Sequence, residues 1–240
     1  MNRYTVAPHV RICRAITDTV GIDLRRNRYF ALGARETAAL HHHGLLMAHD
    51  MERPSLDESQ LASVTESLAR AGLLIRTNAH LPALSADSHH EPRKPRMPPP
   101  GASAGYEYND ALPVRAHHLA TLLRAWQWAR TRLRTHSLLA ISQCVERSRS
   151  STEMPLDRSL SIALVGTFRL LRPFVYCARE QCLLHALTLA RFLAHYHQHP
   201  HWVIGVRTRP WAAHSWVQWD ELIFDGRPDD VGEYTPLLVC

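Results

Sequence analysis

Residues 213–225, AHSWVQWDELIFD, contain two apolar segments separated by the polar pair Asp220-Glu221. Aromatic and β-branched residues on both sides of a short polar break are typical of a β-hairpin. We expect a two-residue turn at Asp220-Glu221, with Trp219 paired to Leu222.

The same hairpin places two candidate catalytic side chains on one face. Continuing the pairing sets Trp216 opposite Asp225, and His214 shares the face of Trp216 because side chains alternate along a strand. His214 and Asp225 then become diagonal neighbours, with Cβ atoms roughly 7 Å apart. A carboxylate there can fix the imidazole tautomer and stabilise its cation. Asp225 is the best candidate, because Asp220 falls in the turn and Asp229 and Asp230 lie beyond the hairpin.

Cys182 begins the apolar segment 183–193, which has helical spacing. Unpaired amides at a helix N-terminus favour the thiolate and can donate to an oxyanion. Alone, a cysteine at this position is more often a packing residue. Cys177 is the other thiol nearby. It follows the aromatic run 174–176, and we expect it to be buried or to support the site.

The second half of the chain predicts an α+β domain. Helices are expected at 114–134, 137–147 and 160–171 and from Cys182 onward, followed by strands at 202–206, 214–219 and 222–225. Helices followed by antiparallel strands are typical of that class.

The first 78 residues predict a smaller, winged-helix-like unit. Strands are expected at 4–16, 19–24 and 29–32, a helix at 33–46, and a closing strand at 73–76. A second helix is capped by Ser55 or Asp57 and closed by Gly72.

Between the two units, residues 79–113 predict a semi-rigid linker. Proline removes backbone donors and favours extended conformations, so this segment does not pack as helix or sheet. We therefore expect domains at 1–78 and 114–240. The segment contains seven prolines: Pro82, Pro92, Pro95, Pro98, Pro99, Pro100 and Pro113.

Composition indicates where the protein is located and which kinds of partner suit it. The N-terminus has no apolar signal segment and the apolar runs are too short for a membrane span, so we expect a cytoplasmic protein with no membrane partner. The five cysteines are odd in number and suggest free thiols. The net charge of +6 suits an anionic partner without identifying one.

Three segments together resemble the maturation protease of lasso-peptide biosynthesis, the B protein. They are residues 182–187, CLLHAL, residues 203–206, VIGV, and residues 213–217, AHSWV. The resemblance implies a transglutaminase-like, papain-like cysteine protease in which Cys182 is the nucleophile, His214 the base and Asp225 the orienting acid. His185 departs from the family pattern, where an arginine is common. The first half of the protease domain matches only in being helical.

The N-terminal unit resembles the leader-recognition domain of such systems through residues 20–24, VGIDL, residues 29–32, YFAL, and residues 71–74, AGLL. The resemblance implies that an extended leader peptide pairs with an edge strand and packs on the helix beside it. The residues implied in leader binding are Tyr29, Phe30, Ala31 and Leu32 on the strand and Leu61, Thr65 and Leu68 on the helix.

In that family the substrate is a ribosomally made precursor, and the freed core passes to an ATP-dependent macrolactam synthetase. This chain has no Gly-rich phosphate-binding loop. We therefore expect no cofactor on this chain and ATP use by the partner.

Three alternatives stay open at the level of sequence. A winged-helix regulator that binds nucleic acid suits the pI of 9.4, but the candidate recognition helix carries Asp57, Glu58 and Glu66, which phosphates repel. A transglutaminase-like, amide-forming enzyme uses the same triad. A metal site would draw on the alternating histidines His195, His197, His199 and His201, but these straddle a helix end and no CxxC or HExxH motif occurs, so we expect no metal site.

Overall fold

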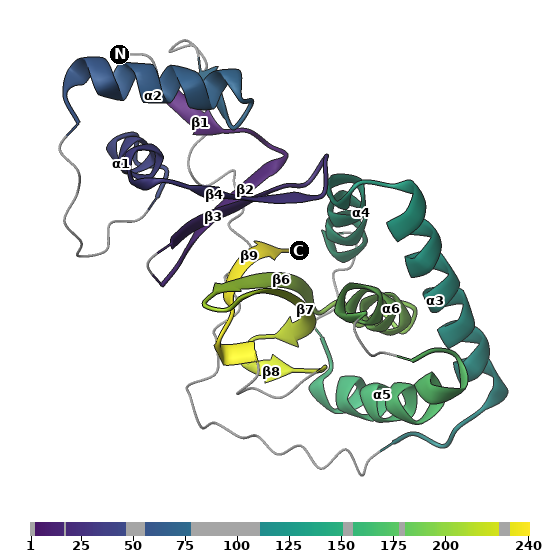
Figure 1. Cartoon of the computed structure of the whole chain (residues 1–240). Coiled ribbons are helices and arrows are strands. Elements are labelled where there is room, and N and C mark those ends of the chain that lie inside the picture. Colours follow the sequence, from purple (N-terminus) through teal and green to yellow (C-terminus); the bar gives the residue numbers. More distant parts are fainter. Residues whose placement is uncertain are drawn as a thin grey trace. The chain divides into compact units, whose positions relative to one another are not determined.

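The computed structural model describes residues 3–16, 18–46, 56–77, 111–150, 156–177, 181–225 and 231–240. The chain divides into two compact units, Met1–Arg93 and Lys94–Cys240 (Figure 1). The expected linker, 79–113, lies outside the described residues except for 111–113. Among the described helices, none is both long and apolar enough to span a bilayer.

The strands of the first unit form two small antiparallel sheets. β1 (Arg3–Val6) pairs with β5 (Leu74–Thr77), and β2 (Val10–Ala15), β3 (Asp18–Asp23) and β4 (Arg28–Leu32) form a second sheet in that order. The single strand expected at 4–16 is therefore wrong: it is two strands. Pro8 cannot donate to a ladder, and the chain turns there, with the N–H of Val10 donating to the carbonyl of Ala7 at 2.8 Å.

The described part of this unit also contains two helices, α1 (Ala34–His42) and α2 (Glu58–Arg70). Asp57 caps α2, as predicted, because its side chain accepts a hydrogen bond from the N–H of Gln60 at 2.8 Å. Gly72, at φ +74°, takes the left-handed conformation that ends the helix. The core of the unit forms where α1, α2 and β5 meet, at Ala39, Leu40, Leu68 and Leu74.

The second unit begins with helices at the predicted places. They are α3 (Ala116–Thr135), α4 (Leu138–Ser150), α5 (Arg158–Leu171), the 3₁₀ turn η1 (Arg172–Phe174) and α6 (Cys182–Ala194). α6 is the central helix, because it packs against α3, α5, β6 and β7 (Figure 1). Its apolar composition follows from this position, since a helix covered on several sides is apolar around most of its circumference.

The strands of this unit form one antiparallel sheet in the order β8-β7-β6-β9. They are β6 (His201–Thr208), β7 (Trp211–Trp219), β8 (Leu222–Ile223) and β9 (Thr235–Val239). The predicted order of helices followed by antiparallel strands is confirmed for this unit. β9 has no counterpart in the predictions. It contains Pro236, which an edge strand tolerates and a central strand does not.

Candidate active site

The predicted hairpin has the predicted register. Trp219 pairs with Leu222, and Gln218 pairs with Ile223. Asp220 occupies the turn at φ +48°, the left-handed conformation that two-residue hairpin turns use. The pairing continues one residue beyond β8, because the N–H of Phe224 donates to the carbonyl of Val217 at 2.9 Å.

Asp225 closes this hairpin through its side chain. Its carboxylate accepts a hydrogen bond from the N–H of Val217, at a point where a backbone carbonyl would otherwise continue the ladder. The side chain is buried, with Asp225 only 7% exposed. Burial raises the pKa of Asp225 well above its ordinary value, while the Val217 N–H and the Arg169 guanidinium act in the opposite direction.

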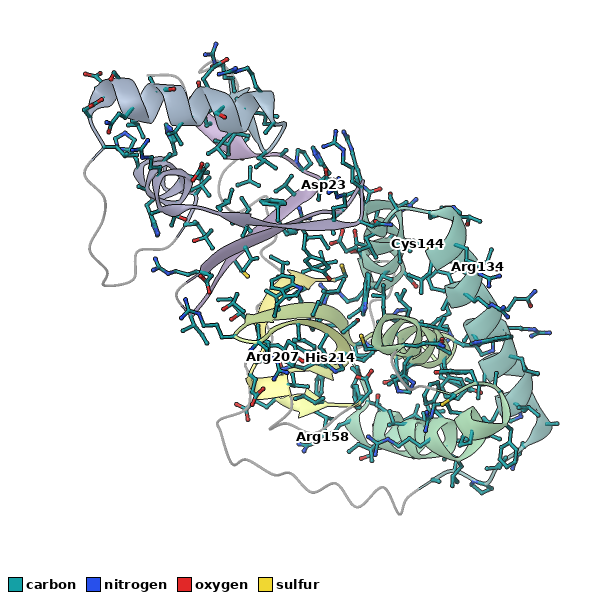
Figure 2. All side chains as sticks on the ribbon, in the orientation of Figure 1. Asp23, Arg134, Cys144, Arg158, Arg207 and His214 are labelled. Atoms are coloured by element: carbon teal, nitrogen blue, oxygen red, sulfur yellow. The ribbon has the colours of Figure 1, made fainter. Side chains whose placement is uncertain are left out.

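His214 lies on β7 between two aromatic rings. Its imidazole stacks on Trp216, with ring centroids 6.1 Å apart and planes at 16°, and lies 5.4 Å from the ring of Tyr234. The shared face of His214 and Trp216 is therefore confirmed. Figure 2 shows His214 on the sheet, in the region where α6 packs against β7.

Gly205 makes room for this arrangement. It pairs directly with His214 across β6 and β7, and a register irregularity between Ile204 and Gly205 marks a bulge against β9. A Cβ at this position would meet the Trp216 ring at 2.6 Å and the Cβ of Tyr234 at 3.0 Å. Only glycine leaves space for the two rings that hold the imidazole.

Cys182 is the first residue of α6 and is partly buried. The free amides of the first turn lie at its position, and α6 packs against β7, the strand that carries His214. The structure thus places His214 and Asp225 on one hairpin and Cys182 at the start of the helix packed on it. Hydrogen bonds that join the three into a triad stay a prediction.

The expectation that Cys177 is buried is wrong. Cys177 is exposed, and Phe174, the first residue of the aromatic run before it, is 84% exposed. Phe174 is the last residue of the 3₁₀ turn η1, and Val175 and Tyr176 after it are only partly buried. An aromatic run therefore did not indicate burial here.

A partly buried pair of polar groups involves His185, one helical turn beyond Cys182. The Tyr176 hydroxyl and His185 Nδ1 are 3.0 Å apart, and Phe168 packs against the His185 ring. Burial, followed by the charges of Arg172, Arg169 and His214, lowers the pKa of His185 to about 4. At neutral pH His185 is therefore an uncharged ring whose Nδ1 can accept a hydrogen bond from the Tyr176 hydroxyl.

The strand predicted to bind a leader peptide is an edge strand. β4 is the outer neighbour of β3 among the described strands, and Tyr29 and Ala31 are exposed. The ring of Phe30 instead lies over Gly21 of β3, where an added Cβ would meet it at 2.3 Å. Leu32 packs against the core of the unit. The four residues therefore divide between the outer surface and the unit's own packing.

The helix residues predicted to bind the leader are more deeply involved in the fold. Thr65 is 3% exposed and Leu68 4%, while Leu61 is partly buried against the same core. The Thr65 hydroxyl lies 3.1 Å from His43 Nε2 at the end of α1. Thr65 and Leu68 therefore support the first unit internally and have little surface left for a peptide.

The alternating histidines do not point to one place. His195 ends α6, His197 takes a left-handed φ of +60°, and His201 begins β6, where its ring contacts Arg149. Among the described residues, no group of three His, Cys, Asp or Glu side chains is placed to hold a metal ion.

Three residues near the site were missed from sequence. Tyr234 packs on His214, Tyr176 bonds to His185, and Arg169 Nη2 donates to the carbonyl of Phe224 at 3.1 Å. Local sequence gives no signal for the first and third, because their partners lie 20 and 55 residues away. Tyr176 is nine residues from His185, and its apolar neighbours concealed a polar role.

Comparison with known proteins agrees with this geometry. The family model of the transglutaminase-like superfamily matches residues 114–239, more than half of the chain and almost all of the second unit. No curated protein and no solved structure matches the chain. Members of that superfamily are usually cysteine-type enzymes, which suits a thiol at the start of a helix packed on a His- and Asp-bearing hairpin. The match over residues 114–239 shows that this chain belongs to the transglutaminase-like superfamily.

Proposed function

We propose that this protein is the leader peptidase of a lasso-peptide pathway. In this proposal it binds the leader of a ribosomal precursor and cleaves leader from core through Cys182, His214 and Asp225. The observation that carries the proposal is the hairpin: His214 on β7 contacts the rings of Trp216 and Tyr234, Asp225 is buried at the end of the same hairpin, and β7 packs against α6, the helix that Cys182 begins.

The chemistry follows from the roles of the three residues. The Cys182 thiolate attacks the carbonyl carbon of the peptide bond between leader and core, and the amides at the start of α6 stabilise the oxyanion. The protonated His214 gives its proton to the leaving amine, which frees the core N-terminus and leaves a thioester on Cys182. His214 then takes a proton from water, whose oxygen attacks the thioester and releases the leader as an acid.

Asp225 orients His214 in this scheme. An ionised carboxylate on the same hairpin stabilises the imidazolium that pairs with the thiolate. Its burial makes that charge costly, so the groups that hold the carboxylate matter for the pH at which the enzyme works.

The first unit is proposed to recognise the leader in a winged-helix-like manner. An edge strand presents unpaired backbone groups that an extended peptide can use, and β4 is such an edge with Tyr29 and Ala31 on its surface. Phe30 and Leu32 support the strand from inside, as Leu61, Thr65 and Leu68 support the helix behind it. The leader contacts are therefore expected at the backbone of β4 and its exposed side chains.

The partner in this proposal is an ATP-dependent macrolactam synthetase that receives the freed core in the cytoplasm. This chain supplies the thiol chemistry with its own residues and binds no cofactor, and ATP is used by the synthetase. Nucleic acid is not a proposed partner, because α2 carries Glu58 and Glu66.

The test is cleavage of a candidate precursor by the full chain, followed by mass spectrometry with and without the synthetase. Cys182→Ala should abolish leader release while fluorescence anisotropy shows that a labelled leader still binds. Cys177→Ala is the matched control, because it removes an exposed thiol five positions away and should cleave normally. Full cleavage by Cys182→Ala refutes the proposal.

The same assay separates hydrolysis from amide formation. A thioester on Cys182 reacts with an amine as well as with water, so a transglutaminase-like enzyme would join added amines to the leader acid. Free leader acid as the only product in the presence of a small primary amine supports the peptidase. A leader amide as the main product supports the amide-forming alternative.

A further inference from the structure

We propose that Arg169 is a positioning residue for Asp225, holding the end of the hairpin in place and supplying the positive charge that the buried carboxylate faces. This inference deepens the proposed function and rests on it for its catalytic meaning. Arg169 lies in the last turn of α5, outside the segments that suggested the triad.

Three hydrogen bonds connect Arg169 to the carboxylate. Arg169 Nη2 donates to the carbonyl of Phe224 at 3.1 Å, and the N–H of Phe224 donates to the carbonyl of Val217 at 2.9 Å. The N–H of Val217 in turn donates to the Asp225 carboxylate. The residue before Asp225 is thus held on both its polar groups, one by α5 and one by β7.

This anchoring is needed because regular pairing stops just before Asp225. β8 ends at Ile223, and beyond it Phe224 adds a single backbone hydrogen bond, from its N–H to the carbonyl of Val217. The guanidinium replaces part of that ladder. Without it, the Phe224 carbonyl loses a charge-assisted hydrogen bond, and the carboxylate loses a fixed neighbour.

Arg169 also affects the charge state of the buried Asp225 carboxylate. A buried carboxylate destabilises the fold unless hydrogen bonds and a nearby cation offset its desolvation. Burial raises the pKa of Asp225, and Arg169 acts to lower it. The cation therefore favours the ionised form that the proposed mechanism requires.

The other polar groups around the carboxylate do not take over this role. Tyr176, after η1, interacts with Asp225 but keeps its proton, because burial raises its pKa far above neutrality. His185, on α6, is uncharged at neutral pH. His214, on β7, changes charge during the proposed reaction. Arg169, on α5, carries a constant charge.

Arg172 provides a matched control. It lies three residues further along the chain, in η1, and both arginines act on the pKa of His185. Arg169 bonds to the Asp225 loop and acts on its pKa, and Arg172 is not among the groups that shift Asp225. Both charges lower the pKa of His185, so removing either one acts on His185 in the same direction, and a shift seen in Arg169→Gln alone reports on Asp225.

The first measurement is the pH dependence of Cys182 alkylation by iodoacetamide, read by mass spectrometry of the peptide that contains Cys182. It uses the full chain and needs no precursor. If Asp225 is protonated, it no longer stabilises the His214 cation, and the thiolate fraction of Cys182 falls. In Arg169→Gln we expect the profile to move to higher pH by about one unit, with a roughly 10-fold lower rate near neutrality. Arg169→Lys should restore most of the rate, and Arg172→Gln should resemble the wild type.

The second measurement is a double-mutant cycle by urea unfolding, which does not depend on the proposed reaction. Arg169→Gln breaks the bond to the Phe224 carbonyl in both backgrounds, so it should raise the unfolding equilibrium constant in each, but by about 5-fold more in the wild-type background than in Asp225→Asn, where the carboxylate charge is gone. Equal effects in the two backgrounds, or equal alkylation profiles for Arg169→Gln and Arg172→Gln, overturn the inference.

The two measurements also distinguish the two proposals. If wild-type Cys182 reacts no faster than exposed Cys177 at any pH, the proposed function fails, and the cycle still decides whether Arg169 holds Asp225. If Cys182 is reactive in the wild type and unchanged in Arg169→Gln, the peptidase proposal stands and the role of Arg169 is refuted.

Discussion

Gly205 lies directly opposite His214 on the neighbouring strand, and replacing it with alanine should reduce both stability and activity. The new Cβ would meet two atoms of the Trp216 ring at 2.6 and 2.7 Å and the Cβ of Tyr234 at 3.0 Å. Ordinary van der Waals contact begins near 3.4 Å, so the ring must retreat by most of an ångström. Trp216 is completely buried, so the ring can move only by displacing its neighbours.

Two magnitudes follow from that displacement. Overpacking a filled core costs about 1–3 kcal/mol, which we expect as the loss in unfolding free energy. The Trp216 ring stacks on His214, so the imidazole moves with it. A misplacement on this scale lowers catalysis by up to about 100-fold, so we expect a loss of about 10- to 100-fold in single-turnover cleavage.

The assay compares Gly205→Ala with Gly232→Ala by urea unfolding and by single-turnover cleavage of the precursor. A Cβ at Gly232 meets nothing within 4 Å, so this control should match the wild type in both measurements. Wild-type stability and cleavage in Gly205→Ala would refute the packing argument. Reduced stability with normal cleavage would show that the Trp216 displacement does not reach His214.

Three further predictions concern the two units separately. Folding raises the pKa of Asp225, so the wild type loses stability as pH rises from the ordinary 3.8 towards the raised pKa. Asp225→Asn has no such loss and should be at least as stable as the wild type at pH 7 in urea unfolding, yet cleave about 100-fold or more slowly. The pKa of His201 is lowered to about 4, mainly by burial, so its contribution to stability is present above the ordinary 6.5 and lost as pH falls toward 4; His201→Gln should lose less stability over that interval in urea unfolding. In the first unit, Gly21→Ala should displace Phe30 and weaken leader binding measured by anisotropy, whereas Gly33→Ala meets only the flexible end of a glutamate side chain and should bind normally.

Each of these predictions has an outcome that contradicts it. Lower stability of Asp225→Asn at neutral pH would mean that the ionised carboxylate stabilises the fold. His117→Gln is the exposed control. If His201→Gln loses as much unfolding free energy in acid as the wild type, other groups cause the acid sensitivity. Unchanged leader binding in Gly21→Ala would separate the leader surface from the packing of β3 and β4.

The hairpin and the start of α6 could be predicted because their signals are local. The register followed from a two-residue turn and the alternation of side chains, and the shared face of His214 and Trp216 followed from the same alternation. The helix boundary at Cys182 followed from the apolar segment that begins there.

Other features depend on contacts between distant segments and had no local signal. β1 is a separate strand because it pairs with β5, about seventy residues away. β9 pairs with β6 despite containing Pro236, which in a short apolar segment argues against a strand. Local sequence does not distinguish Arg169 from Arg172, and only the fold shows that Arg169 reaches Phe224.

The residues of the leader-binding surface could also not be predicted fully from sequence. The pattern of residues 29–32 identified a strand, but an apolar residue on an edge strand can face either a partner or the core. Phe30 and Leu32 turned out to support the unit itself, as did Thr65 and Leu68. Residues that bind a peptide and residues that pack in the core are of the same types here, so only their burial in the structure distinguishes them.

The most direct test of the central claim is to trap the covalent intermediate on Cys182. The full chain is mixed with a candidate precursor, quenched with acid within the first turnover and measured as intact protein. We predict an added mass equal to the leader acid minus one water, located on the peptide that contains Cys182 and missing in Cys182→Ala. Leader release by Cys182→Ala at the wild-type rate, without any adduct, would contradict a thiol peptidase at this site.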